Sequence, residues 1–230
     1  MKFALMLVSH LHRFIYLKTR KTGGTSVEIY FEPFCHDPTA PFREQHQRDE
    51  LVTEFGIVGS RGMPIHDKMW YNHIPASGLK AMLGEEIFNT YYKFCVIRDP
   101  FDKTVSGFWY WVTPEQRESL RTAPFDVVRQ TFERWVLAQA LPVDKIIYTI
   151  DGEPVADRYI RYERMHEDME AVCGDLGLPW HPERLRRYKS GTRQRGEPFA
   201  EYYTECAAAR VAEVFAWELA EFGYQPPVRR

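Results

Sequence analysis

The sequence predicts a single α/β domain over residues 1–230, with a mostly parallel central sheet flanked by helices. Short apolar runs with β propensity alternate with segments of helical periodicity, and two of those runs end in loops rich in basic residues. The length of 230 residues suits one α/β domain with a buried core. A composition of 44% hydrophobic and 27% charged residues is typical of a folded globular chain.

The first half of the chain contains two strand–loop–helix units. Residues 14–17 (FIYL) predict a strand, and the helix after it is expected to begin at Thr25 and to stop before Pro33. Residues 91–97 (YYKFCVI) predict a second, buried strand. The other elements expected here are a strand at 55–58 and helices at 76–83 and 101–111.

The second half of the chain is predicted to be mainly helical. Residues 124–140 place apolar side chains at helical spacing, and we assign that stripe to the core. Asp151-Gly152 predicts the turn of a small hairpin. The elements expected here are hairpin strands at 146–150 and 155–162 and helices at 163–176 and 205–222.

Charge and composition narrow the possible partners. A formal net charge of −2 provides no general attraction to nucleic acid or to an anionic membrane, so any anion must be held by locally clustered basic residues. The apolar start of the chain is interrupted by His10, His12 and Arg13, which argues against a signal peptide or a membrane anchor. The four cysteines are scattered, as free thiols are. We therefore expect a cytoplasmic protein without a nucleic-acid partner.

The stretch KTRKTGGTSVE, residues 18–28, follows the first predicted strand and suits anion binding. Gly23 and Gly24 allow backbone N–H groups to turn inward, and the start of the next helix favours negative charge. Lys21 adds a full positive charge. A nucleotide-triphosphate P-loop places its lysine after the glycines, whereas Lys21 precedes them. The loop is therefore interpreted as an anion cradle of another kind.

A second basic motif, VIRDPFDKTVS, follows the buried strand at 91–97. Arg98 comes directly after that strand and Ser106 lies two helical turns further on, so a guanidinium and a hydroxyl can share one phosphate group. The alternative interpretation is an Arg98–Asp99 ion pair followed by an ordinary surface helix.

Together these two motifs resemble those of the PAPS-dependent sulfotransferases, especially the carbohydrate 2-O-sulfotransferases and their bacterial relatives. NHIPASGLKAMLGEEIF, VADRYIRYERM and the last predicted helix also resemble later segments of this family. The resemblance implies a P-loop-like sulfotransferase fold, 3′-phosphoadenosine 5′-phosphosulfate (PAPS) as the donor, and no metal. It places Arg98 and Ser106 on the 3′-phosphate. The residues that it places on the 5′-phosphosulfate are Lys21, Thr22, Gly23, Gly24, Thr25 and Ser26.

Two residues depart from the family pattern. Arg20 stands where many members have proline, which changes how the chain enters the loop and adds a charge. Val27 replaces the tryptophan that stacks on adenine in cytosolic relatives.

The resemblance also implies catalytic roles. Lys21 suits the leaving oxygen, and His73 matches the family's histidine and is our candidate base for the acceptor hydroxyl. His66 and Asp67 are reserve candidates. In related enzymes the serine equivalent to Ser106 also engages the loop lysine and delays hydrolysis of the donor, which we expect of Ser106 and Lys21 here.

Three further residues are candidates for donor contacts. Lys189 and Arg193, in the basic segment RRYKSGTRQRG, resemble the family's second contact to the 3′-phosphate, although such a charge run is usually a solvated surface. Tyr162 is a candidate for contact with adenine, and ordinary packing is the alternative. The aromatic residues at 108–111, with Trp70 and Tyr71, either line an acceptor site or belong to the core.

The leading hypothesis is an enzyme that transfers a sulfonate group from PAPS to a hydroxyl of a glycan or small-molecule acceptor. A nucleotide-dependent phosphoryl transferase would explain the glycine loop but gives Arg98 and Ser106 no role. A non-catalytic nucleotide-binding protein is the third possibility. Binding of PAPS rather than ATP, and turnover, distinguish the three.

Overall fold

The computed structural model describes residues 6–45, 47–62, 68–70, 73–186, 188, 193 and 195–227. The chain forms two compact units, each made of two stretches of sequence. Unit 1 comprises Met1–Ile97 and Asp144–Tyr188, and unit 2 comprises Arg98–Val143 and Lys189–Arg230.

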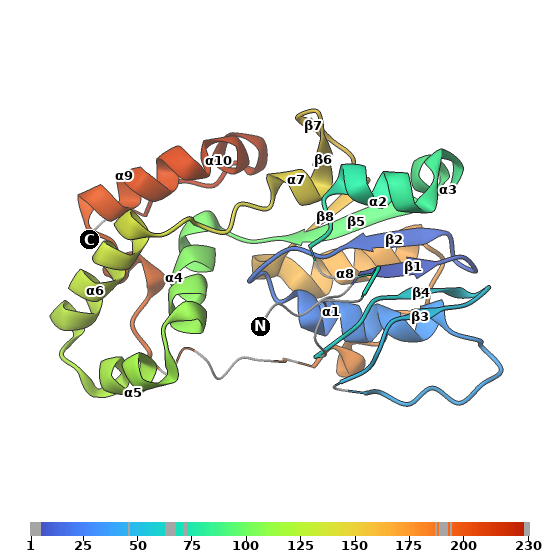
Figure 1. Cartoon of the computed structure of the whole chain (residues 1–230), viewed down its shortest axis with the longest axis horizontal. Coiled ribbons are helices and arrows are strands. Elements are labelled where there is room, and N and C mark those ends of the chain that lie inside the picture. Colours follow the sequence, from blue (N-terminus) through green and yellow to red (C-terminus); the bar gives the residue numbers. More distant parts are fainter. Residues whose placement is uncertain are drawn as a thin grey trace. The chain divides into compact units, whose positions relative to one another are not determined.

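Unit 1 is built on a six-stranded mixed sheet with the order β3-β4-β1-β2-β5-β8 (Figure 1). The expectation of a mostly parallel sheet is wrong, because β1 pairs antiparallel with both β2 and β4, and β3 pairs antiparallel with β4. The chain reverses directly between β1 and β2 in a short turn, which can only produce an antiparallel pair. The strands are β1 (Leu7–Ser9), β2 (Phe14–Leu17), β3 (Leu51–Val52), β4 (Gly56–Val58), β5 (Tyr92–Ile97) and β8 (Arg158–Arg161).

The other half of the sheet is parallel, and it determines where the loops of unit 1 lie. β2 pairs with β5, with Leu17 opposite Cys95, and β5 pairs with β8, with Ile97 opposite Arg161. The carboxyl ends of these three strands therefore meet at one edge of the sheet. The glycine loop leaves β2 at this edge, where open α/β sheets usually hold their ligands.

Helices cover both faces of this sheet (Figure 1). On one face, side chains such as Phe14, Tyr16 and Phe94 pack with Val27 and Phe31 in a fully buried core. Helices α1 (Gly24–Phe31) and α8 (Met165–Asp175) supply the cover on that face, and the opposite face carries α2 (Ala76–Leu83), α3 (Glu85–Thr90) and α7 (Lys145–Tyr148).

The hairpin predicted at 146–162 is shorter than expected. Strand β6 (Thr149–Ile150) pairs with β7 (Glu153–Pro154), whereas the residues after them leave the hairpin and form β8. Pairing with β5 gives β8 four ladder partners in a buried sheet, which the two-residue hairpin does not offer. Short 3-10 helices complete unit 1: η1 (Glu32–Cys35), η2 (Tyr162–Arg164) and η3 (Pro182–Arg184).

Unit 2 is helical, with its own aromatic core that includes Phe108, Trp109, Phe132 and Tyr202. The predicted final helix is two helices, since the helical run breaks at Phe215. The elements are α4 (Pro100–Trp111), α5 (Pro114–Thr122), α6 (Phe125–Ala138), η5 (Phe199–Tyr202), α9 (Glu205–Val214) and α10 (Ala216–Phe222).

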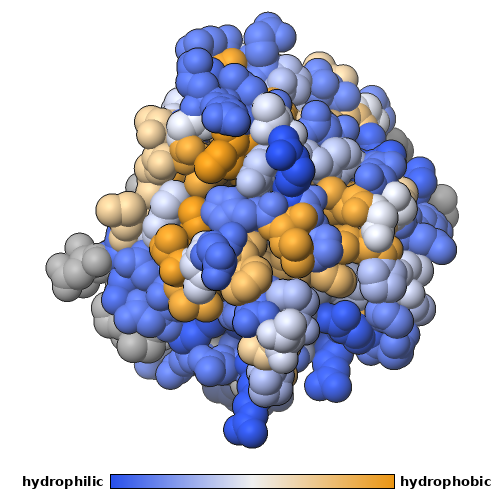
Figure 2. All heavy atoms as spheres, turned by 90° about the vertical axis from the view of Figure 1, so that its right-hand side faces the viewer, coloured by the Kyte–Doolittle hydropathy of each residue, from blue (hydrophilic) through white to orange (hydrophobic). Residues whose placement is uncertain are grey.

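Within the described residues, every helix is too short or too polar to cross a membrane. Figure 2 views the end of unit 1 where the β1–β2 and β3–β4 turns lie, and there orange hydrophobic patches alternate with blue charged and polar side chains. Leu11, in the first of these turns, is half exposed. Apolar groups reach this surface in separate patches.

Candidate functional site

The glycine loop, residues 18–26, is referred to here as the Lys21 loop. Gly23 has φ +77° and caps the start of α1, where the backbone needs a left-handed residue. A Cβ on Gly24 would come within 2.7 Å of the Tyr16 hydroxyl oxygen. That hydroxyl donates a hydrogen bond to the Gly24 carbonyl at 3.1 Å. Both glycines are therefore required by local geometry.

The hydroxyl side chains of the loop differ in their surroundings. Thr19 and Thr22 are buried and hydrogen-bond each other at an Oγ1–Oγ1 distance of 2.7 Å. The Oγ of Ser26 accepts a hydrogen bond from the Tyr188 backbone N–H at 3.2 Å. Thr22 and Ser26 thus stabilise the loop from inside, whereas Lys21 and Thr25 are partly exposed.

The two lysines of KTRK have different roles. The Nζ of Lys18 lies 2.7 Å from Oε2 of Glu28, and both side chains are buried. Lys21 is partly exposed and has φ +60°, a left-handed conformation that lysine rarely adopts. Of the two lysines, Lys21 is the one whose charge reaches the surface of the loop.

His73 lies against the Lys21 loop. Its Nδ1 is 2.9 Å from the carbonyl oxygen of Lys18. Because a carbonyl only accepts, Nδ1 carries the proton, and in the neutral ring Nε2 keeps a lone pair for accepting another. Burial lowers the pKa of His73 to about 4; Lys18 and Arg20 also lower it, whereas Asp144 raises it. The imidazole is therefore neutral at pH 7, as a general base must be.

Lys21 and His73 both have a left-handed backbone conformation, which is strained for residues other than glycine. The non-glycine residues with positive φ among those described are Arg13, Lys21, His73 and Asp151. Arg13 and Asp151 lie in the tight β1–β2 and β6–β7 turns, which often need this conformation. Lys21 lies in the glycine loop and His73 in a turn, and among the described residues neither is flanked by a strand hairpin. Strained residues held by their surroundings are characteristic of functional sites.

Arg20 is held by a buried carboxylate. Oδ2 of Asp144 accepts from the Arg20 backbone N–H at 2.8 Å, and Oδ1 lies 3.3 Å from Nη1 of the same residue. A proline at position 20 would lack this N–H. The unusual residue of the loop is thus tied to a residue that sequence reasoning did not select.

Tyr162 directly follows β8 and lies beside the same loop. Two of its ring carbons are 3.0 Å from where a Cβ on Gly23 would stand, and 39% of the residue is exposed. The Lys21 loop, His73 and Tyr162 are thus brought together within unit 1, although they are far apart in sequence. Val27 is fully buried and belongs to the core.

Unit 2 groups a different set of candidate residues. Nε and Nη2 of Arg98 donate to the same Asp102 oxygen at 2.8 and 2.6 Å, and Nη1 of Arg193 lies 3.6 Å from the other oxygen. Asp99 caps α4, since its side chain accepts from the Phe101 N–H. Asp102 therefore holds both arginines that were predicted to contact the 3′-phosphate.

Ser106 lies one helical turn after Asp102 on α4, on the same side of the helix, and is partly exposed. The Ser106 hydroxyl therefore lies on the same side of α4 as the Asp102 carboxylate that binds Arg98. The predictions for Lys189, His66 and Asp67 lie outside the described residues.

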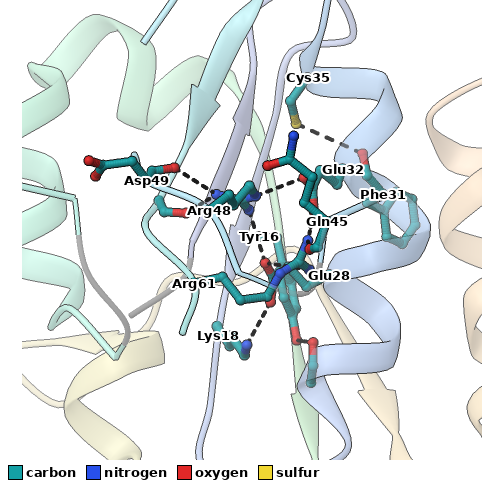
Figure 3. Close-up of polar contacts among 12 residues, drawn as sticks. Tyr16, Lys18, Glu28, Phe31, Glu32, Cys35, Gln45, Arg48, Asp49 and Arg61 are labelled. Carbon is teal, nitrogen blue, oxygen red and sulfur yellow. Dashed lines mark hydrogen bonds and ion pairs between the residues drawn. The ribbon is translucent and has the colours of Figure 1, made fainter. Parts of the chain in front are cut away.

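Sequence reasoning also missed a buried ionic network behind the Lys21 loop (Figure 3). The network consists of Lys18, Glu28, Glu32, Arg48 and Arg61, whose side chains are at most 8% exposed. The shortest contacts are Lys18–Glu28 and Arg61–Glu32 at 2.7 Å and Arg48–Glu32 at 2.8 Å. The network contains three cations and two carboxylates, and each carboxylate contacts at least two of the cations.

A sequence signal for half of this network does exist. Glu28 and Glu32 are four residues apart in the apolar stretch VEIYFE, a spacing that places two side chains on one side of a helical run, and Glu32 follows directly after α1. Burial raises the pKa of Glu28, while Lys18, Arg61 and Arg48 oppose that rise. Arg48 precedes β3 and Arg61 follows β4, and neither stands in a pattern that predicts an ion pair.

The aromatic cluster predicted to line an acceptor site or to belong to the core contains both buried and exposed residues. Phe108 and Trp109 are buried in the core of unit 2, and Trp70 is buried in unit 1. Trp111 is 45% exposed and stacks on Trp135, with ring centroids 6.3 Å apart and an interplanar angle of 15°. Trp111 is therefore exposed at the surface and Tyr110 is partly exposed, whereas Tyr71 lies outside the described residues.

Comparison with protein-family models, with curated proteins and with solved structures gave no match.

Proposed function

We propose that this protein is a sulfotransferase that moves a sulfonate group from PAPS to a hydroxyl of a carbohydrate or small-molecule acceptor. The observation that carries the proposal is that Lys21 belongs to the glycine loop and His73 hydrogen-bonds to the same loop at Lys18. Both residues have the left-handed conformation. In-line transfer needs a cation for the leaving oxygen and a base for the acceptor hydroxyl. Lys21 and His73 are of these two types.

A P-loop-like sulfotransferase fold belongs to the same proposal. The order β2, Lys21 loop, α1 in the parallel half of the sheet supports it. The first turn of α1 contains no acidic residue, and its N-cap Gly23 provides no side chain to occupy the helix N–H groups. These groups favour an anion such as the 5′-phosphosulfate.

In the proposed step, the acceptor oxygen attacks sulfur while its proton passes to Nε2 of His73. The bond between sulfur and the bridging oxygen breaks, and adenosine 3′,5′-bisphosphate leaves with the negative charge that Lys21 stabilises. His73 returns its proton to solvent afterwards. The hydrogen bond from Nδ1 to Lys18 keeps Nε2 available for this role.

Arg98, Ser106 and Arg193, considered within unit 2 alone, are proposed for the 3′-phosphate because the motif VIRDPFDKTVS and the basic segment before α9 resemble the family's contacts to that group. Arg98 presents its guanidinium beside Asp102, Ser106 supplies a hydroxyl, and Arg193 adds a second guanidinium. Guanidinium groups bind phosphate oxygens in pairs, which suits this role. Tyr162, next to Gly23, is the candidate for contact with the adenine.

The direct test is incubation with labelled PAPS and a panel of glycans, phenols and alcohols, followed by mass detection of a transferred sulfonate. We expect transfer by the natural chain and a drop in kcat of about 100-fold or more in Lys21→Met and His73→Gln. Lys80→Met and His181→Gln change surface residues of the same types and should keep full activity. Full activity in both site variants would overturn the assignment.

A second experiment tests the 3′-phosphate group. Arg98→Lys loses paired hydrogen bonds, so adenosine 3′,5′-bisphosphate should bind about 10- to 100-fold more weakly. Adenosine 5′-monophosphate lacks the 3′-phosphate and should bind as before. Arg129→Lys, on the surface of α6, is the matched control. An equal loss for both nucleotides would contradict the assigned role.

The same measurements separate the two alternatives. Phosphoryl transfer from ATP without sulfonate transfer would identify a kinase-like enzyme. Binding of adenosine 3′,5′-bisphosphate without turnover on any acceptor would identify a nucleotide-binding protein.

A further inference from the structure

Asp144 is a buried carboxylate, 1% exposed, placed directly before α7. Both of its oxygens contact Arg20, the residue that precedes Lys21: Oδ2 binds the backbone N–H at 2.8 Å and Oδ1 lies 3.3 Å from the guanidinium. Burying a carboxylate is unfavourable unless it is paired and hydrogen-bonded. This double contact therefore fixes the backbone where it turns into the left-handed Lys21.

His73 lies against the loop that Asp144 holds, since its Nδ1 donates to the Lys18 carbonyl oxygen at 2.9 Å, and the charge of Asp144 acts on its imidazole. The charged groups that face His73 are Lys18 and Arg20 from the Lys21 loop and Asp144 from the segment before α7. Burial and the charges of Lys18 and Arg20 lower the pKa of His73, whereas the charge of Asp144 and the hydrogen bond to the Lys18 carbonyl raise it. Asp144 thus contacts the Lys21 loop at Arg20 and acts on His73 through its charge.

We propose that Asp144 is a positioning residue that holds the Lys21 loop in place and stabilises positive charge on His73. Its catalytic meaning rests on the proposed function, because His73 gains charge only when it takes the acceptor proton. Its structural meaning does not. Without Asp144 the loop would lose the bond at Arg20, and His73 would be a weaker base.

The first test concerns the hydrogen bond and needs no substrate. Hydrogen exchange of the Arg20 amide should be at least tenfold faster in Asp144→Ala than in the natural chain. Asp157→Ala is the matched control, since that carboxylate accepts from the Lys93 backbone N–H at 2.7 Å at the other end of β5. An unchanged Arg20 amide in Asp144→Ala would overturn the positioning role.

The second test concerns the charge. In an NMR titration from pH 8 to 4, the His73 signals of the natural chain should begin to shift as the pH approaches its pKa of about 4. In Asp144→Asn, which keeps a side-chain oxygen but loses the charge, they should stay unshifted to pH 4, and in Asp157→Asn they should follow the natural chain. Identical titration in Asp144→Asn would overturn the electrostatic role.

The catalytic test is a separation of kcat from KM. Asp144→Asn should lower kcat at least tenfold at pH 7, with the KM for PAPS within about twofold, and Asp144→Glu should recover part of the loss. If the natural chain transfers no sulfonate, the proposed function fails while exchange and titration still decide on Asp144. If the natural chain is active and Asp144→Asn keeps its kcat, the positioning role alone fails.

Discussion

Lys18 and Glu28 form a buried ion pair, with 2.7 Å between Nζ and Oε2, that joins the start of the Lys21 loop to the middle of α1. This ion pair links the Lys21 loop to α1, the helix that directly follows the loop. Glu28 also contacts Arg48 and Arg61, so the loop is connected through α1 to the segments that precede β3 and follow β4 (Figure 3). The rigidity of the site therefore depends on residues that do not belong to it.

Neutralising Glu28 should strongly destabilise the fold. Glu28→Gln leaves Lys18, Arg48 and Arg61 buried with one carboxylate, Glu32, to balance them, and breaking such a network typically costs about 3–5 kcal/mol. Urea unfolding followed by circular dichroism measures the loss. Glu118→Gln breaks an exposed pair with Arg121 and should leave the midpoint unchanged. Equal midpoints for the two variants would show that the network contributes nothing.

The left-handed backbone at Lys21 should make glycine more stable than alanine at this position. Lys21→Gly relieves the strain of φ +60°, so its free energy of unfolding should exceed that of Lys21→Ala by about 1 kcal/mol, although both variants lack the cation. At Lys80, inside α2, the order should reverse by a similar amount. Thermal unfolding of the four variants measures both differences. The same order at both positions would refute the strain.

His73 should make stability depend on pH. Its pKa is about 4 in the folded chain against 6.5 for an ordinary histidine, so between these values the unfolded state binds more protons. The stabilising contribution is complete above pH 6.5 and is lost as the pH falls towards 4, by up to about 3 kcal/mol. His73→Gln should lose less stability over that range. The difference between the two urea series removes the contributions of the other histidines, and parallel curves would contradict the low pKa.

Substitution by alanine should have opposite effects on stability at two glycines of unit 1, Gly24 and Gly174. Gly24→Ala places a Cβ 2.7 Å from the Tyr16 hydroxyl oxygen, so it should destabilise the chain and displace the loop. Gly174 lies inside α8 with open space around it, and Gly174→Ala should stabilise by about 0.5–1 kcal/mol. Melting temperatures that shift in the same direction would contradict this difference.

The sequence predicted elements best where the signal is local. The apolar runs at β2 and β5 and the helices beside them lie within a residue or two of their expected bounds. The run before His10 was assessed only as a possible signal peptide, and it is strand β1. Strand β8 was assigned to a hairpin because the turn at Asp151 is a local signal, whereas pairing with β5 depends on distant residues. Helices α3 and α5 were not predicted, and the strand expected at 146–150 is wrong over its first part, where the chain forms helix α7.

The candidate site shows the same division. Lys21, Gly23 and Gly24 stand in a recognisable order, and their need for unusual backbone angles explains that order. Asp144 escaped notice because a single aspartate in LPVDK has no pattern, and its role appears only when the distant Arg20 faces it. Asp102 stands four residues after Arg98, a spacing at which a sequence alone suggests a pair, whereas its contact with Arg193 depends on the fold.

The position of β8 has a consequence for the order in which a growing chain can fold. The strand that pairs with the outer side of β5 comes from residues 158–161, so the ribosome synthesises α4, α5 and α6 before it. Until then β5 is an open sheet edge, and Phe94 and Val96 lack the cover that α8 provides. A nascent chain is thus exposed to mispairing at β5 throughout that interval, which is the kind of intermediate that chaperones protect.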